Sequence, residues 1–289
     1  MKLLLNSLSK SFGSNHVLRG IDFTFEQGNV YALLGRNGSG KTTLFNLIAN
    51  EVKKDAGNVW IEANGEKRAL LPEDLFFMVA NPALPNFLTG YEFIEFFMDV
   101  NPKSGGHEKT VDEYMNWIGF DEADKWRLIQ GYSLGMKNKL QMLMFMILEP
   151  AIILMDEPLT SLDVIMQLQI KKLIREIRKN HIILFSTHIL QLATDLCDEI
   201  VVLNNGQLTQ IDHELLKDPA FESRIITILS EDAATEDLPE LQEFVEDAIQ
   251  AEASIESAAP NENTRNTVEQ KDLDHKFSEH VTSYHDGDA

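Results

Sequence analysis

The clearest chemical signature is residues 35–42, GRNGSGKT, which fit the pattern G-x-x-x-x-G-K-[ST] directly after the apolar run at 30–34. Glycines let the backbone wrap around phosphates with its N–H groups pointing inward. A helix is expected at 41–50, and its N-terminus would add partial positive charge at the loop. A glycine-rich turn that binds nothing is disfavoured by this strand and helix context. The sequence predicts a phosphate-binding loop with these members: Gly35, Asn37, Gly38, Ser39, Gly40, Lys41, Thr42 and Thr43. Lys41 supplies charge for the β and γ phosphates, and the Thr42 hydroxyl is a magnesium ligand.

A second candidate is the run IILMDE at residues 152–157, an apolar strand that ends in two carboxylates. An acid at the C-terminal edge of a strand can hold magnesium, and the next acid can orient a water molecule for attack on the γ phosphate. We assign the metal to Asp156, together with Thr42, and the water to Glu157. Strands that end in acidic turns are common. The functional interpretation of this pair therefore depends on the phosphate loop elsewhere in the chain.

Residues 132–137, YSLGMK, resemble the signature sequence of the ATP-binding cassette (ABC) ATPases. The order phosphate loop, signature, DE strand, Ser-Leu-Asp at 161–163 and then His188 reproduces the order of that family's motifs over about residues 2–212. The resemblance implies an α/β fold with a P-loop NTPase core, an antiparallel β side sheet and an inserted α-helical subdomain. It also implies ATP and Mg²⁺ as ligands.

The resemblance assigns further residues to the site. Ser133 and Gly135, at a helix N-terminus, would close over ATP held by a second ABC subunit. Asp163 would lie in the loop that crosses this dimer interface, Phe12 would stack on adenine, and His188 would contact the γ phosphate. A lone Phe is more often a core residue and a lone His an ordinary one, but the ordered motifs favour the functional interpretation.

The sequence departs from the family pattern at one important position. The family usually has Gln, or Glu in several exporter subfamilies, at the end of the strand LFFMV, where this chain has Ala80 followed by Asn81. Either Asn81 substitutes after a one-residue shift, or the metal keeps an extra water molecule and hydrolysis or coupling is altered. The signature also has Leu134 where Gly is commoner, as in exporter members, and Met136 and Lys137 where Gln is commoner.

Hydrophobic patterning predicts the elements that position these residues. Apolar character on both faces predicts buried strands at 30–34, 151–155 and 182–185, and alternation predicts a half-exposed antiparallel sheet from 17–25 and 59–62. Helical periodicity predicts a helical subdomain at about 85–148, with helices at 91–100, 111–119, 122–129 and 134–148. Residues 1–218 are thus expected to form the nucleotide-binding domain.

Composition limits the possible partners. The net charge of −21 disfavours nucleic acid, and residues 231–289 alone carry 17 acidic and 3 basic side chains. Residues 219–289 are therefore predicted to be an acidic extension, partly helical with a disordered end, either solvated or docked on a partner. The single cysteine, Cys197, and the lack of an apolar run of about 18 residues favour a cytoplasmic protein.

Together these features predict a subunit that binds and hydrolyses ATP. We expect a homodimer formed on ATP, driving export through a separate transmembrane permease from the inner face of the cell membrane. The spelling of the motifs is most similar to single-cassette exporters, including those that protect against antimicrobial peptides. Two alternatives stay open: a catalytically weak regulatory partner in a mixed pair, suggested by Ala80, and a soluble ABC ATPase without a membrane partner. Glu157 and His188 argue against the regulatory role.

Overall fold

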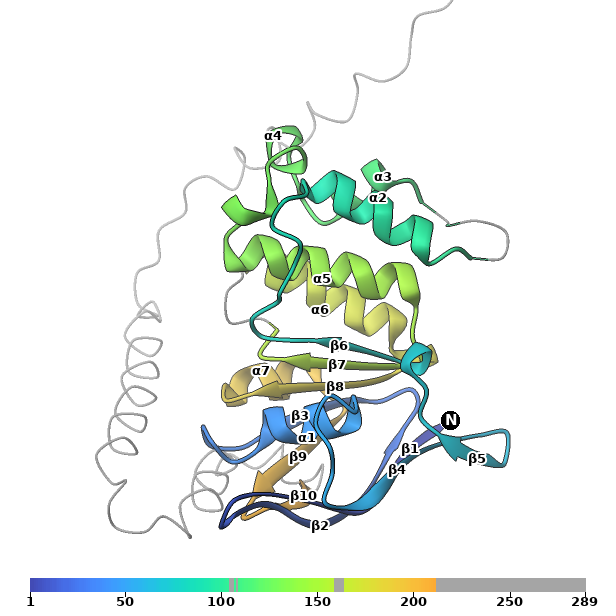
Figure 1. Cartoon of the computed structure of the whole chain (residues 1–289), viewed down its shortest axis with the longest axis vertical. Coiled ribbons are helices and arrows are strands. Elements are labelled where there is room, and N and C mark those ends of the chain that lie inside the picture. Colours follow the sequence, from blue (N-terminus) through green and yellow to red (C-terminus); the bar gives the residue numbers. More distant parts are fainter. Residues whose placement is uncertain (104–106, 108, 159–163, 212–289) are drawn as a thin grey trace, which may run out of the picture. The chain divides into compact units, whose positions relative to one another are not determined.

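The computed structural model describes residues 1–103, 107, 109–158 and 164–211, and at 164–166 and 169 only the backbone (Figure 1). The acidic extension at 219–289 and Asp163 lie outside the described residues. The expectation of an α/β fold with two kinds of sheet is confirmed: one sheet has six strands and the other has four.

The six-stranded sheet has the order β10-β9-β3-β8-β7-β6. Its strands are β3 (Val30–Leu34), β6 (Leu75–Met78), β7 (Ile152–Asp156), β8 (Ile182–Thr187), β9 (Glu199–Asn204) and β10 (Gln207–Ile211). All neighbours are parallel except β9 and β10. Because the strands are parallel, the C-terminal ends of β3, β7 and β8 meet at one edge, where α/β proteins bind ligands.

Alternate side chains of the central strands enter two separate hydrophobic cores. On β7, Ile153 and Met155 face one core, and Ile152 and Leu154 face the other. The first core lies under the helices, and the second lies against α1 (Lys41–Ile48) and the four-stranded sheet. Burial on both faces explains the continuously apolar strand sequences.

The four-stranded antiparallel sheet has the order β2-β1-β4-β5. Its strands are β1 (Lys2–Phe12), β2 (Asn15–Glu26), β4 (Ala56–Ala63) and β5 (Glu66–Ala69). One face is buried and the other exposed, as the alternating pattern predicted. The turn between β1 and β2 lies next to the predicted adenine-stacking residue, Phe12.

The helices between β6 and β7 differ in part from the predicted ones. They are α2 (Gly90–Val100), α3 (Val111–Trp117), α4 (Glu122–Lys125), the 3₁₀ helix η2 (Ile129–Gly131) and α5 (Leu134–Leu148). The predicted helix at 111–119 ends early because Gly119 adopts a φ of 74°, a left-handed stop. The predicted helix at 122–129 is wrong beyond Lys125, because the chain instead pairs with the segment before α2: Leu128 bridges Thr89.

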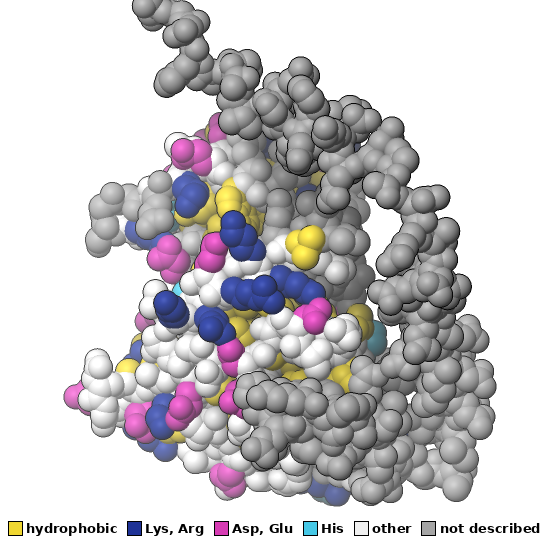
Figure 2. Space-filling model, turned by 180° about the vertical axis from the view of Figure 1, so that it is seen from behind, with side chains coloured by type: hydrophobic (Ala, Val, Ile, Leu, Met, Phe, Trp, Pro, Cys, Tyr) yellow, Lys and Arg dark blue, Asp and Glu magenta, His cyan; other side chains and the backbone are white. Residues whose placement is uncertain are grey.

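The last helices pack against the same hydrophobic core as α5. They are α6 (Val164–Ile177), η3 (Arg178–Asn180) and α7 (Leu190–Leu196). Seen from behind, Lys and Arg side chains gather across the middle of the molecule, with acidic groups beside them (Figure 2). Lys171 pairs with Asp195 at 3.1 Å and Arg178 pairs with Asp198, so charges on α6 and η3 tie this layer together. Within the described part of the chain, no helix is both long and apolar enough to cross a bilayer.

Candidate functional site

The phosphate loop connects β3 to α1, and its glycines are needed for different reasons. Gly40 precedes α1 with a φ of 105°, and Gly38 has a φ of 81°, so both adopt a conformation that L side chains rarely take. A Cβ at Gly35 would lie 2.5 Å from Ser39 Oγ and 2.8 Å from the carbonyl oxygen of Leu203. The loop therefore leaves no room for a side chain at Gly35. Asn37 and Gly38, in contrast, are exposed.

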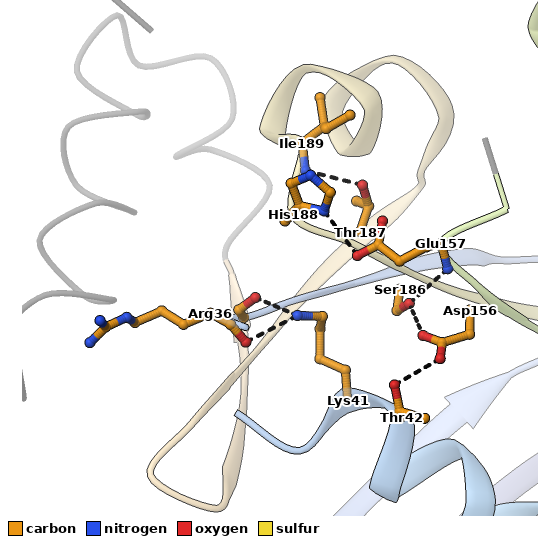
Figure 3. A network of polar contacts seen from close by, with 10 residues as sticks. Arg36, Lys41, Thr42, Asp156, Glu157, Ser186, Thr187, His188 and Ile189 are labelled. Atoms are coloured by element: carbon orange, nitrogen blue, oxygen red, sulfur yellow. Dashed lines mark hydrogen bonds and ion pairs between the residues drawn. The ribbon is translucent and has the colours of Figure 1, made fainter. Parts of the chain in front are cut away.

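Lys41 is buried, and its ammonium folds back onto the loop. Its Nζ donates to the carbonyl oxygens of Gly35 at 2.6 Å and Arg36 at 3.1 Å (Figure 3). Burial lowers the pKa of Lys41, while the charges of Glu157 and Asp156 oppose this shift. Two carbonyl groups compensate a buried cation only partly, so an anion within reach would be attracted to it.

Asp156, at the end of β7, lies at the centre of a hydrogen-bond chain. Its Oδ2 accepts from Thr42 Oγ1 at 2.7 Å, and its Oδ1 accepts from Ser186 Oγ on β8 (Figure 3). The predicted metal pair, Thr42 and Asp156, is thus in direct contact although 114 residues separate the two in sequence. Sequence analysis missed Ser186; its signal was a hydroxyl at the polar end of the strand IILFST.

Glu157 leaves the strand in a left-handed conformation with a φ of 50°, rare for a residue with a side chain. Its backbone N–H donates to Ser186 Oγ at 3.0 Å. Its Oε1 lies 3.0 Å from Nδ1 of His188, just after β8 (Figure 3). The structure therefore brings together the two predicted catalytic side chains, at the same edge as the phosphate loop.

The oxygen ligands fit a magnesium ion that substrate and water complete. Magnesium is usually bound through one or two protein oxygens, with phosphates and water supplying the rest. The Thr42 hydroxyl and the Asp156 carboxylate are such ligands. No group of three or more His, Cys, Asp or Glu side chains suited to a metal exists among the described residues.

Phe12 ends β1 with its ring 52% exposed, and Lys10 Nζ lies 5.1 Å from the ring centroid. The start of β2 contacts the phosphate loop, because a Cβ at Gly40 would lie 2.6 Å from Val17 Cγ1. The hairpin that carries Phe12 therefore borders the loop, and the ring is available for stacking.

The signature residues lie on a different element. Ser133 caps α5, accepting a hydrogen bond from the N–H of Met136 at 3.2 Å, and its side chain is exposed. Gly135 is in the first turn. In the part of the chain that the structure describes, no hydrogen bond connects either residue to the phosphate loop. This half of the predicted site is thus separate from the other half within one chain.

Ala80 lies beside the site but offers no ligand. β6 pairs in parallel with β7, with Met78 opposite Met155. Continued beyond the end of β6, the same register would put Ala80 opposite Glu157. Asn81, the other candidate for the missing Gln, is exposed.

The comparisons with known proteins agree with this geometry. The family model described as "ABC transporter" matches residues 18–160. The chain is 31% identical to the uncharacterized ABC transporter ATP-binding protein YxlF of Bacillus subtilis, covering 72% of this chain and 69% of that protein. It is 30% identical to the probable sulfate/thiosulfate import ATP-binding protein CysA of Chlorella vulgaris, covering 73% and 91%.

Two further similarities extend this result. The lantibiotic transport ATP-binding protein SrtF of Streptococcus pyogenes is 29% identical, with 71% of this chain and 88% of that protein covered. A solved ATP-binding subunit of an ABC transporter superposes with a TM-score of 0.67 at 25% identity, covering 85% of this chain and 99% of that one. The chain therefore belongs to the ATP-binding subunits of ABC transporters, a family of ATPases.

Proposed function

We propose that two copies of this chain bind and hydrolyse ATP between them on the cytoplasmic face of the membrane and thereby drive export through a separate permease. The observation that carries the proposal is the hydrogen-bond chain through Thr42, Asp156, Ser186, Glu157 and His188. It joins a phosphate loop to a carboxylate and an imidazole, the groups that phosphoryl transfer to water requires.

The side chains divide the chemistry of hydrolysis. Lys41 exchanges its two carbonyl partners for the β and γ phosphates. Glu157 takes a proton from the attacking water, whose oxygen bonds to the γ phosphorus as the bond to the ADP oxygen breaks. His188, oriented by Glu157, donates to the transferred phosphate. Magnesium bound by Thr42 and Asp156 supplies positive charge for the phosphate oxygens.

A second copy supplies the missing half of the site. Ser133 and Gly135 are at the start of α5, a 15-residue helix whose N-terminus carries a partial positive charge. The side chain of Ser133 is exposed, so this end is open to an anion held by another subunit. ATP would thus join the two copies, and hydrolysis would release them.

An exposed aromatic surface near α2 is the proposed docking site for the permease. We define it by Phe87, Tyr91, Trp126 and Leu128. Phe87 is 79% exposed and Trp126 53% exposed, and the rings of Tyr91 and Trp126 stack with centroids 4.5 Å apart. The hydrogen bonds from Ile129 N to Leu88 O and from Gln130 N to Asn86 O hold the two segments together. Clustered exposed aromatic residues are typical of protein interfaces.

The signature sequence favours export over import, because it has Leu134 in place of Gly, as in exporter members of the family. The relatives include a protein named for lantibiotic transport and one named for sulfate/thiosulfate import, so their names do not decide the direction. Transport of a labelled lantibiotic into inverted vesicles that contain this chain and its permease would test it. ATP-dependent uptake into inverted vesicles supports export. Uptake into right-side-out vesicles without uptake into inverted vesicles contradicts it.

A purified-protein ATPase assay that compares the native chain with Glu157→Gln tests the catalytic assignment. The native chain should hydrolyse ATP, and the variant should lose about 10²- to 10⁴-fold in kcat while it binds ATP as a stable dimer. A native chain that binds ATP but does not hydrolyse it would favour the regulatory role that Ala80 suggests.

A further inference from the structure

Gln141 is a buried polar side chain that the proposed mechanism does not use. It lies on the second turn of α5 and is 3% exposed, next to Asn138 at 2%. Its Oε1 accepts from Val79 N at 3.0 Å, and its Nε2 donates to Val79 O at 3.0 Å and to Asn138 Oδ1 at 3.2 Å. One side-chain amide therefore satisfies both backbone groups of Val79, as a neighbouring strand would.

The position of Val79 gives this contact its importance. Val79 is the first residue after β6, the edge strand of the six-stranded sheet. Ala80 follows it, and the chain then continues through the exposed Phe87 to α2. Gln141 thus connects the helix that Ser133 caps with the segment that runs from the catalytic edge to the aromatic surface.

The surrounding contacts cannot supply the same connection. Apart from Asn138, the buried neighbours of Gln141 on α5 are apolar, among them Leu140, Met142 and Leu143. Apolar contacts are non-directional, so they fix the register of a helix against a backbone segment less specifically than hydrogen bonds do. A pair of hydrogen bonds at 3.0 Å fixes one register between α5 and the backbone.

We propose that Gln141 is a positioning residue that transmits movement of α5 to residues 79–89 through its two hydrogen bonds to Val79. This inference rests on the proposed function, in which ATP brings a second subunit against the start of α5. When α5 moves, Val79 moves with it, and the displacement reaches both Ala80 at the catalytic edge and the aromatic surface.

The substitution Gln141→Leu keeps approximate volume and removes the two hydrogen bonds to Val79 and the one to Asn138. We expect the Val79 amide to exchange with deuterium at least about tenfold faster, because its acceptor is gone. We expect kcat for ATP to fall about tenfold with KM within about twofold, since the phosphate loop is untouched. Hydrogen exchange followed by mass spectrometry and steady-state kinetics measure the two effects.

The substitution Gln141→Glu adds a pH signature that a purely structural role would not give. A protonated carboxyl can accept from Val79 N and donate to Val79 O, as the amide does, whereas a carboxylate repels Val79 O and Asn138 Oδ1. Burial raises the pKa of a carboxyl. The kcat of this variant, divided by the native kcat at the same pH, should therefore rise as pH falls from about 8 to about 6.

A matched control is Gln210→Leu on exposed β10, at the opposite edge of the sheet, which should change neither measurement. If Gln141→Leu exchanges the Val79 amide faster but keeps the native kcat, the proposal is overturned. An exchange rate of the Val79 amide equal to the native rate would also overturn it. If the native chain proves to lack ATPase activity, exchange with and without Mg-ATP decides. A nucleotide-dependent change at 79–89 that Gln141→Leu loses supports the proposal, and the same change in both proteins contradicts it.

Discussion

The catalytic edge of the six-stranded sheet and the start of α5 are the two halves of the proposed site, and they are built differently. At the edge, Thr42, Asp156 and Glu157 already hydrogen-bond within one network. At α5, Ser133 caps its own helix and its side chain faces solvent. The first half is preorganised by hydrogen bonds within the chain, whereas Ser133 in the second half is open to a group held by another subunit.

The largest expected effect is the loss of phosphate binding at the preorganised half. Lys41→Met removes the cation, and since hydrogen bonds to charged groups contribute about 1.5–3 kcal/mol each, ATP affinity should fall about 100-fold or more. Isothermal titration measures the affinity. Affinity within about twofold of native would contradict the role of Lys41.

The same substitution should stabilise the nucleotide-free protein. Burial lowers the pKa of Lys41, so the ammonium costs stability in the folded state. Because the folded-state pKa is the lower one, this cost is complete below it and disappears as pH rises from the folded-state to the unfolded-state pKa. Lys41→Met should therefore raise Tm near neutral pH and raise it by less at high pH.

The next effect separates the two halves. Gly135→Asp places a carboxylate at the start of α5, where it repels a γ phosphate held by a partner. ATPase activity should fall about 100-fold or more while ATP affinity stays native, because the phosphate loop is intact. Steady-state assays and titration of the same preparation check this.

Mixing the two inactive variants tests whether the halves come from different chains. In a mixed pair, the copy with native Lys41 faces the copy with native Gly135, which makes one complete site. Random pairing gives half mixed pairs with one intact site of two, so roughly a quarter of the native rate should return. No recovery would indicate that each chain completes its own site.

Whether a feature of the two halves can be predicted from the sequence depends on how far apart in the chain its interacting residues lie. The phosphate loop and the strand ends could be predicted because local patterns encode them: glycines before a helix, and apolar runs that end in Asp156 and His188. Ser186 and Gln141 were missed because their roles depend on partners 30 and 62 residues away. Likewise the end of α4 depends on the bridge between Thr89 and Leu128, which no helical periodicity encodes.

A smaller effect is expected at Phe12, which borders the preorganised half. Stacking on a base contributes about 1–3 kcal/mol, so Phe12→Ala should weaken ATP binding about 5- to 160-fold. Phe87→Ala is the matched control, because its ring is even more exposed and lies on the proposed permease surface. Phe87→Ala should leave ATP affinity native and reduce co-purification with the permease. If instead Phe87→Ala weakened ATP binding and Phe12→Ala reduced co-purification, the two assignments would be exchanged.

The smallest effect is expected at Ala80, where a ligand can be restored. If the register of β6 against β7 continues past Met78, the carboxamide that Ala80→Gln introduces would come within reach of a magnesium ion held by Thr42 and Asp156. One added ligand contributes about 0.5–1.5 kcal/mol, so the half-saturating Mg²⁺ concentration for ATPase activity should fall about 2- to 12-fold. Titration of Mg²⁺ at constant ATP measures it.

Asn81→Ala distinguishes the two explanations of the missing Gln. Because Asn81 is exposed, we expect its removal to leave the Mg²⁺ dependence unchanged. A several-fold increase in the half-saturating concentration would instead assign the ligand to Asn81 through a one-residue shift. The preorganised half would then be complete without Ala80, and Ala80→Gln would gain nothing.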